Sequence, residues 1–219
     1  MKKIDIASWN RSGLYTLFRG VEFPHFSATT EVDVTALQAF AKANHLSFYR
    51  LCLYLVCRAA NECRAFRLRL VPDGVVEHER VGIAPTVTIC GVVNFLVVDY
   101  YENPAEFILR YNEQEERVRE MGTKLNLEDD GMPSVYSSCV PWYHLTGAVN
   151  PMCSKEDSIP RFTWGKYVPR EGRLIMGMAV QCHHALVDGA DVAAFLSCFQ
   201  RLADTPEQTF AALLAEELL

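Results

Sequence analysis

Apolar residues between positions 47 and 66 recur three or four residues apart. They are Phe48, Leu51, Cys52, Leu55, Val56 and Ala59. This spacing places them on one side of a helix, and there are enough of them for that helix to be largely buried. We therefore expect a core helix over residues 47–66.

Four further helices are expected from start signals and from periodicity. Thr35 and Gln38 match a capping box that opens a helix over residues 35–43. A charged amphipathic helix follows over 104–121, with Pro104 tolerated in its first turn. The chain is expected to finish with a helix over 189–202 and another from Pro206, with Thr205 as its N-cap.

Strands are expected where β-branched residues gather between turn signals. Residues 26–32 have strand composition, 68–81 is predicted to form a hairpin around Pro72-Asp73-Gly74, and 84–100 suggests further strands. Residues 162–168 and 174–183 are expected to form a long hairpin around the turn 169–172. The polar segment 123–133 is expected to be a loop.

The last of these strands leads to a pair of histidines. Side chains alternate between the two faces of a strand, so Leu174, Met176, Met178, Val180 and Cys182 share one face. His184 continues that face, whereas His183 points the other way. Only one of the two histidines can therefore enter a given cleft, and His183 is expected to be structural.

Composition narrows the class of protein. The chain has 219 residues, of which 50% are hydrophobic and 22% charged, and its composition does not shift along its length. These values favour one globular domain over residues 1–219. A net charge of −6 argues against a nucleic-acid surface, although local Lys and Arg residues can still hold a small anion.

Apolar segments and cysteines in the sequence predict the cellular location of the protein. No segment approaches the roughly 18 uninterrupted apolar residues of a membrane span, and no apolar run follows Lys2 and Lys3. The eight cysteines form no CxxC pair, so we expect free thiols rather than a zinc site or disulfide framework. A cytoplasmic protein with no membrane or nucleic-acid partner is expected.

The segment His183 to Gly189 carries the candidate chemistry. The imidazole of histidine changes charge near neutral pH, which suits His184 to remove a proton from a hydroxyl group. Asp188 stands just before a glycine and is expected to orient the loop through an ion pair with an arginine. Adjacent histidines on opposite strand faces converge poorly on one ion, so no metal site is expected.

His183-His184-Ala185-Leu186-Val187-Asp188-Gly189 resembles the HHxxxDG signature of CoA-dependent acyltransferases. The signature occurs in chloramphenicol acetyltransferases, dihydrolipoyl acyltransferase cores and larger condensation domains. A chain of this length suits the first two. The implied fold is α/β, a two-layer sandwich of a mixed β-sheet and helices.

Three further segments, in the same order along the chain, resemble the chloramphenicol acetyltransferase family. Trp9-Asn10-Arg11 matches W-x-R, whose arginine pairs with the motif aspartate, so Arg11 and Asp188 are the implied partners. Ser138-Cys139-Val140-Pro141-Trp142 is similar to S-A-x-P-W, although Ser137 is an alternative to Ser138. Thr163-Trp164-Gly165-Lys166-Tyr167 resembles T-M-x-K-Y, which lies along the CoA site.

The resemblance implies direct acetyl transfer from acetyl-CoA to a small hydroxylated acceptor. His184 would be the general base, and Ser138 would donate a hydrogen bond to the developing oxyanion. Asp188 and Arg11 would hold the site, while Thr163, Lys166 and Tyr167 would contact CoA. The family is trimeric with sites between subunits, so a homotrimer is also implied.

The resemblance weakens in the acceptor pocket. Phe18 is retained as a substrate-binding residue, but Glu22 and Pro24 fall where the family has aromatic and aliphatic lining, and residues 148–152 replace an apolar stretch. An acceptor different from chloramphenicol is therefore one competing hypothesis. A dihydrolipoamide acyltransferase and a trimeric binding protein without activity are two more. His25, His45, His78 and His144 have no supporting partners in sequence.

Overall fold

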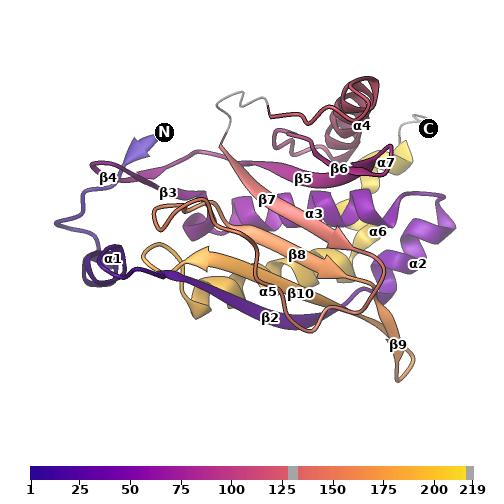
Figure 1. Cartoon of the computed structure of the whole chain (residues 1–219). Helices are drawn as coiled ribbons and strands as arrows, with labels where there is room; N and C mark the ends of the chain where they lie inside the picture. Colours follow the sequence, from indigo (N-terminus) through magenta and orange to yellow (C-terminus); the bar gives the residue numbers. More distant parts are fainter. Residues whose placement is uncertain (128–132, 216–219) are drawn as a thin grey trace.

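The computed structural model describes residues 1–127 and 133–215, and a mixed sheet forms its centre (Figure 1). The strand order is β2-β10-β8-β7-β5-β6, with β9 paired to β10. The strands are β2 (His25–Asp33), β5 (Gly82–Ile89), β6 (Val92–Phe95), β7 (Ser134–Val140), β8 (Arg161–Gly165), β9 (Val168–Arg170) and β10 (Arg173–His183). The pairs β5–β7 and β7–β8 are parallel, and the others are antiparallel.

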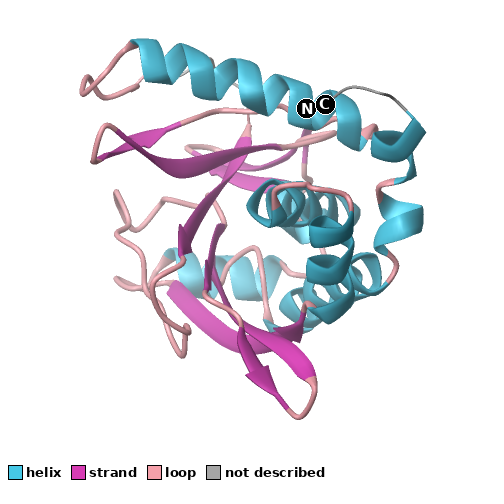
Figure 2. Ribbon diagram, turned by 90° about the vertical axis from the view of Figure 1, so that its right-hand side faces the viewer, coloured by secondary structure: helices cyan, strands magenta, loops and turns pink. Residues whose placement is uncertain are grey.

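Helices cover one face of this sheet, and the long loop after β7 covers the other (Figure 2). The helices are α1 (Ser12–Arg19), α2 (Thr35–Ala43), α3 (Phe48–Glu62), α4 (Pro104–Glu120), α5 (Gly189–Asp204), α6 (Pro206–Thr209) and α7 (Ala211–Ala215), with a 3-10 turn, η1 (Arg64–Arg67). A small second sheet has the order β1 (Lys2–Lys3), β4 (Gly74–Glu77), β3 (Leu68–Val71). The expected two-layer α/β architecture is confirmed.

The core lies between the sheet and the helices α3 and α5. Met176, Met178, Val180 and Cys182 are all buried, as expected from their shared strand face. Val180 pairs with Phe162, whose ring centroid lies 4.6 Å from that of Phe195 in α5. One cluster of buried apolar residues extends from Ile4 to Phe210.

The expected elements are largely present, but two helix starts differ in detail. The helix over 35–43 forms without a capping box, because the hydroxyl of Thr35 donates to Asp33 and accepts from the backbone N–H of Leu174. Thr205 precedes α6 without capping it, since its hydroxyl donates to the carbonyl of Arg201. The Thr35 hydroxyl is thus bonded to the distant Leu174 and the nearby Asp33, and the Thr205 hydroxyl to the preceding turn of α5.

Two other expectations need correction. The sequence predicted no helix in the opening segment, yet α1 is a helix that buries none of its side chains completely. The long hairpin is split, because the tight turn at Glu171-Gly172 joins β9 to β10, and β8 pairs with β10 farther along. The predicted loop over 123–133 falls partly outside the described residues.

The loop after β7 lies directly on the sheet face opposite the helices. A Cβ atom at Gly177 would come 1.8 Å from the carbonyl oxygen of Leu145, and one at Gly165 would come 2.6 Å from its backbone nitrogen. Both positions therefore require glycine, which lets the loop backbone approach β8 and β10. Among the described residues, no helix has the length and apolar composition to cross a lipid bilayer.

We expect Gly177→Ala to destabilise the protein, because the new methyl group displaces the backbone at Leu145. Overpacking of this kind costs about 1–3 kcal/mol. In a chain of this size each kcal/mol lowers the melting temperature by about 2–4 °C. Thermal unfolding followed by circular dichroism measures the change.

Gly147→Ala is the matched control, because Gly147 lies in the same loop and has open space around its Cβ position. An unchanged melting temperature for Gly177→Ala would contradict the close approach of loop and sheet.

Candidate active site

His184 follows directly after β10, at the end of the sheet where α1 also lies (Figure 1). Its backbone N–H donates to the carbonyl of Pro24 at 2.9 Å, which extends the pairing between β10 and β2 by one step. The half-buried ring stacks on Phe18 of α1 with a centroid distance of 4.2 Å and lies 4.7 Å from Phe26 of β2. Two aromatic rings therefore fix the plane of the imidazole.

One ring nitrogen of His184 is already engaged within the chain. Nδ1 lies 3.1 Å from the carbonyl oxygen of Val187. Because a carbonyl only accepts hydrogen bonds, Nδ1 must carry the hydrogen of the neutral ring. Nε2 is then left with its lone pair, which is the form that a general base requires.

His183 has a different environment on the opposite face of the sheet. Its Nε2 donates to the carbonyl of Lys155 at 3.0 Å, and its Nδ1 accepts the backbone N–H of Ala185 at 3.1 Å. Burial, assisted by the nearby His25, lowers the pKa of His183 to about 4. A neutral ring with both nitrogens bonded to backbone supports the structural role expected for His183.

Arg11 reaches the motif aspartate from the other end of the chain. Its Nη2 lies 2.7 Å from Oδ2 of Asp188, so the implied ion pair is present. Its Nη1 lies 2.6 Å from Oδ2 of Asp191, a second carboxylate that the sequence motifs did not indicate. The three-residue spacing of the two aspartates was the available signal, since it is the spacing of a capping box.

The two aspartates also hold the start of α5. Oδ1 of Asp188 accepts the backbone N–H groups of Ala190 and Asp191, and Oδ2 of Asp191 accepts the backbone N–H of Asp188. Burial opposes ionisation of Asp188, but these N–H groups and the charge of Arg11 outweigh it and lower its pKa. These bonds and the two ion pairs to Arg11 hold the turn between His184 and the start of α5. We call the group formed by Arg11, Asp188 and Asp191 the ion-paired corner.

Ser138 lies on β7, on the face opposite the helices. The hydroxyl of Thr86 on β5 donates to Ser138 Oγ at 3.0 Å, which leaves the hydrogen of Ser138 available to another acceptor. Ser137 points the other way, is 4% exposed, and its hydroxyl has no hydrogen-bond partner. Of the two serines, Ser138 therefore lies on the face opposite the helices with its hydrogen available, and Thr86 is a neighbour that the sequence did not indicate.

His184 and Ser138 of one chain are far apart. Ser138 pairs across β8 with Thr163, which pairs with Ala179 on β10. His184 lies five residues beyond Ala179 along the chain, and β10 is two strands away from β7. At about 3.3 Å per residue and about 4.8 Å per strand, the Cα atoms of His184 and Ser138 are about 19 Å apart. Reacting groups must meet at about 3 Å, so these two side chains cannot serve one site within a single chain.

The residues expected to contact CoA do not share one surface. Thr163 is 5% exposed and its hydroxyl is hydrogen-bonded to the side chain of Asn150, beside Ser138. Lys166 is exposed just beyond β8, and Tyr167 is half-buried with its ring edge-on to Phe48 at 5.3 Å. Lys166 and Tyr167 are thus accessible to a ligand, whereas Thr163 is engaged in the interior.

His144 also has partners that the sequence did not indicate. Its Nε2 lies 3.1 Å from Oε1 of Glu31, and its Nδ1 lies 3.2 Å from the carbonyl oxygen of Lys166. Arg170 forms two hydrogen bonds with the same carboxylate, and these bonds, together with that of His144, lower the pKa of Glu31. This cluster ties β2 to the segment that carries Lys166.

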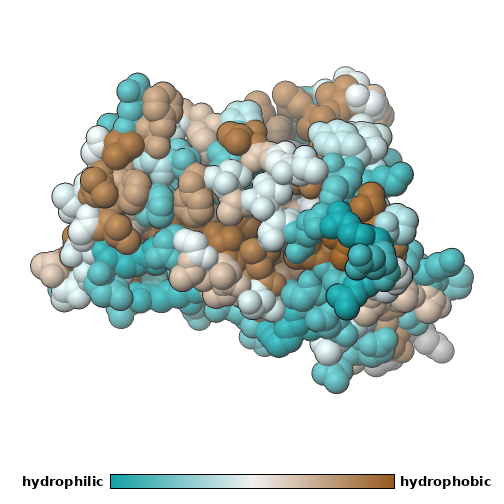
Figure 3. Space-filling view, turned by 90° about the horizontal axis from the view of Figure 1, so that it is seen from below, coloured by the Kyte–Doolittle hydropathy of each residue, from teal (hydrophilic) through white to brown (hydrophobic). Residues whose placement is uncertain are grey.

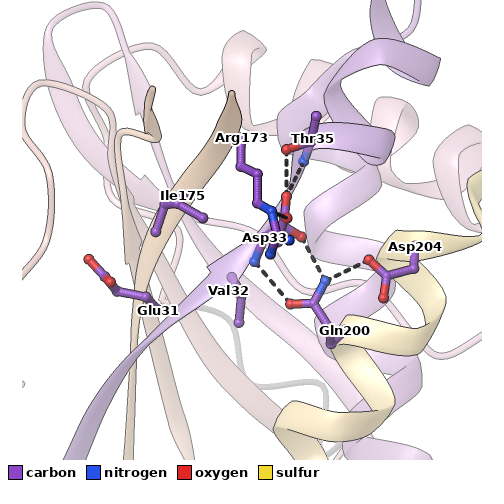
Figure 4. A pocket seen from close by; sticks show the side chains of 8 residues that line it. All are labelled: Glu31, Val32, Asp33, Thr35, Arg173, Ile175, Gln200 and Asp204. Carbon is purple, nitrogen blue, oxygen red and sulfur yellow. Dashed lines mark hydrogen bonds and ion pairs between the residues drawn. The ribbon is translucent and has the colours of Figure 1, made fainter. Parts of the chain in front are cut away.

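A recess of ≈ 740 Å³ lies at the end of β2 away from His184 (Figure 4). Figure 4 shows the side-chain amide of Gln200 bonded to both the N–H and the carbonyl of Asp33, with its amide nitrogen also donating to Asp204. The recess is therefore a polar region in which Gln200 covers the outer edge of β2. It does not contain the residues that carry the candidate chemistry.

Groups of three or more His, Cys, Asp or Glu residues placed to hold a metal ion do not occur within residues 1–127 and 133–215. The residues indicated by the sequence motifs, His184, Ser138 and Arg11 with its two aspartates, supply a ring nitrogen, a hydroxyl group and an ion-paired support. These are the groups that an acyl transfer through a tetrahedral oxyanion needs, namely a base and a hydrogen-bond donor.

Comparison with known proteins places this arrangement in a family. A solved chloramphenicol acetyltransferase superposes with a TM-score of 0.80 and 27% identity, covering 92% of this chain and 99% of that one. Dihydrolipoamide acetyltransferase from Azotobacter vinelandii superposes with a TM-score of 0.67 and 17% identity, covering 90% of this chain and 88% of that one, which shows a shared fold alone.

Sequence comparison is more specific. Chloramphenicol acetyltransferase 2 from Escherichia coli is 28% identical over 211 residues, covering 92% of this chain and 96% of the relative. Chloramphenicol acetyltransferase from Clostridium perfringens is 27% identical, covering 93% and 95%. The sequence model described as chloramphenicol acetyltransferase matches residues 1–200, and the chain therefore belongs to the chloramphenicol acetyltransferase family.

Proposed function

We propose that this protein is an acetyl-CoA-dependent O-acetyltransferase that acts on a hydroxyl group of chloramphenicol or of a similar small acceptor. The observation that carries the proposal is the form of His184, whose Nδ1 is bonded to the carbonyl of Val187 while Nε2 keeps its lone pair. The family membership supplies the donor and the acceptor class.

In the proposed reaction His184 Nε2 takes the proton of the acceptor hydroxyl as its oxygen attacks the thioester carbonyl of acetyl-CoA. The tetrahedral intermediate carries a negative oxygen, and the hydroxyl of Ser138 donates a hydrogen bond to it. Collapse of the intermediate breaks the carbon–sulfur bond, and the CoA sulfur takes the proton from His184. No acyl-enzyme is formed.

Phe18 is proposed to line the acceptor side of the site, because its ring lies against that of His184. On the donor side, exposed Lys166 is suited to a CoA phosphate, and Tyr167 to its apolar parts. For Thr163 to contact CoA, as predicted, its hydrogen bond to Asn150 must break. Glu22 is exposed near Phe23 and Pro24, so a different hydroxylated acceptor stays a competing hypothesis.

A homotrimer with sites between subunits is proposed as the working form. The separation of His184 and Ser138 supports this, because a base from one subunit can meet the serine of another only across an interface. Apolar side chains are exposed near His184, with Leu17 58% and Phe23 82% exposed. Figure 3 shows apolar atoms at the surface on the end of the molecule that carries α1.

A cytoplasmic location is part of the proposal. All eight cysteines are free, and several are buried, which suits a reducing compartment. Two competing functions are acetyl transfer to dihydrolipoamide and binding by a trimer without activity. Acetyl transfer to added dihydrolipoamide would support the first. Turnover that is lost in a His184 variant would argue against the second, because a binding protein has no activity to lose.

We expect His184→Ala to lower acetyl transfer by about 10²–10⁴-fold, because general-base catalysis contributes about that much. Thiol release from acetyl-CoA in the presence of chloramphenicol measures the rate, and size-exclusion chromatography checks the assembly. His45→Asn is the control, since His45 is exposed and asparagine tolerates its positive φ of 56°. Undiminished turnover in His184→Ala would refute the assignment of the base.

Ser138→Ala is expected to lower kcat by about 10²–10³-fold, the usual cost of one oxyanion donor. Ser137→Ala makes the same change at the neighbouring residue, where the buried hydroxyl has no partner, and should leave kcat unchanged. Steady-state kinetics on both variants gives the comparison. Equal losses in both would show that the serine acts through strand packing and not through the oxyanion.

Mixed assemblies test whether sites form between subunits. Co-expression of His184→Ala with Ser138→Ala, each of which alone retains at most about a hundredth of the parent activity, should restore about one quarter of the parent activity. Each shared site receives an intact base with a probability of about one half and an intact serine with the same probability. Two separable affinity tags allow the mixed species to be isolated. No recovery in mixed assemblies would mean that the base and the serine must come from the same chain.

A further inference from the structure

Asp191 is one peptide group away from the proposed general base. The peptide that joins Val187 to Asp188 has its carbonyl oxygen 3.1 Å from His184 Nδ1 and its nitrogen 2.8 Å from Oδ2 of Asp191. The same peptide plane therefore accepts the hydrogen of the base and donates its own hydrogen to the carboxylate. The resemblance to the family pairs Arg11 with Asp188 and gives Asp191 no role.

We propose that Asp191 is a positioning residue for His184, acting through the peptide between Val187 and Asp188. This inference rests on the proposed function, in which His184 is the base. Asp191 fixes the orientation of the peptide, and its negative charge polarises that peptide so that the carbonyl becomes a stronger acceptor for Nδ1–H. The tautomer with the lone pair on Nε2 is thereby favoured.

The surroundings of Asp191 suit this task. Its carboxylate also accepts Nη1 of Arg11 at 2.6 Å, so it is held in place independently of the peptide. The side chains of Arg11 and Asp191 are only 16% and 24% exposed, and Val187 is buried. Limited access of water strengthens the hydrogen bonds along the chain from Arg11 through Asp191 and the peptide to His184.

Asp188 has a different task in the same corner. Its Oδ1 accepts the N–H groups of Ala190 and Asp191 at the start of α5, and its Oδ2 accepts Arg11. None of these bonds leads to the ring of His184. Asp188 is thus the cap of the helix, while Asp191 is the residue linked to the base, and the two carboxylates are not interchangeable.

Asp191→Ala is expected to lower kcat by about 10- to 100-fold, as happens when partners that orient other functional histidines are removed. The KM for acetyl-CoA and for the acceptor should stay within about two-fold, because the proposed role concerns the base and not either substrate. Asp191→Asn keeps an oxygen that can accept from the peptide, so its kcat should be intermediate. Asp204→Asn, at the far end of α5, is the matched control and should match the parent.

The state of the ring is read independently of activity from ¹⁵N NMR of full-length protein with labelled histidine, with the signals assigned through His184→Ala. The parent should show hydrogen on Nδ1 of His184 and a bare Nε2. In Asp191→Ala the signals should shift toward a mixture of the two tautomers. Circular dichroism confirms that the variant is folded, and if it is not, Asp191→Asn carries the same comparison.

Unchanged kcat and unchanged ring signals in folded Asp191→Ala would overturn the inference. A loss of kcat with unchanged ring signals would also overturn it, since the residue would then act on something other than the tautomer. Failure of the proposed function looks different, because the parent protein itself would release no thiol. The NMR comparison still decides the role of Asp191 in that case.

Discussion

The antiparallel register between β2 and β10 is the constraint on which the rest of the structure depends. Nine consecutive pairs run from Ile175 with Asp33 to His183 with His25. Because side chains alternate, a slip of one residue would exchange the two faces of β10 along its whole length. The buried side chains of Met176, Met178 and Val180 would then leave the core, so the packing that stabilises the sheet also determines which histidine follows onto the helix side.

The second organising feature is the ion-paired corner after β10. Arg11 comes from the N-terminal segment, 177 residues away from Asp188, and meets two carboxylates at the start of α5. One guanidinium faces two negative side chains, and the backbone N–H groups of the helix start supply further positive character. The corner thus joins the N-terminus, the end of β10 and α5, and it sets the position of the peptide against which His184 rests.

Two adjacent histidines illustrate how environment separates function in one sequence motif. His183 is bonded through both nitrogens to backbone groups, and burial holds its pKa at about 4. His184 has one nitrogen bonded to a carbonyl and its ring between aromatic side chains. The first ring anchors the loop at Lys155, and the second keeps a free lone pair. Alternation along the strand is the physical origin of the difference.

The sequence by itself determined the elements with strong periodicity, the buried face of β10, the candidate base and the pairing of Arg11 with Asp188. The first three follow from local spacing and from the motif His183 to Gly189, whereas the pairing of Arg11 with Asp188 was implied by the resemblance to the chloramphenicol acetyltransferase family. Only the tertiary structure decided that Asp191 lies beside Arg11 and Thr86 beside Ser138, that α1 is a helix, and that the hydroxyl of Thr35 bonds elsewhere than at its own helix start. It also separated His184 from Ser138 by the sheet register. The physical reason is that hydrogen bonds and ion pairs between residues distant in the sequence leave no periodic pattern in it, and they outweigh local capping preferences when the folded chain brings a better partner within reach.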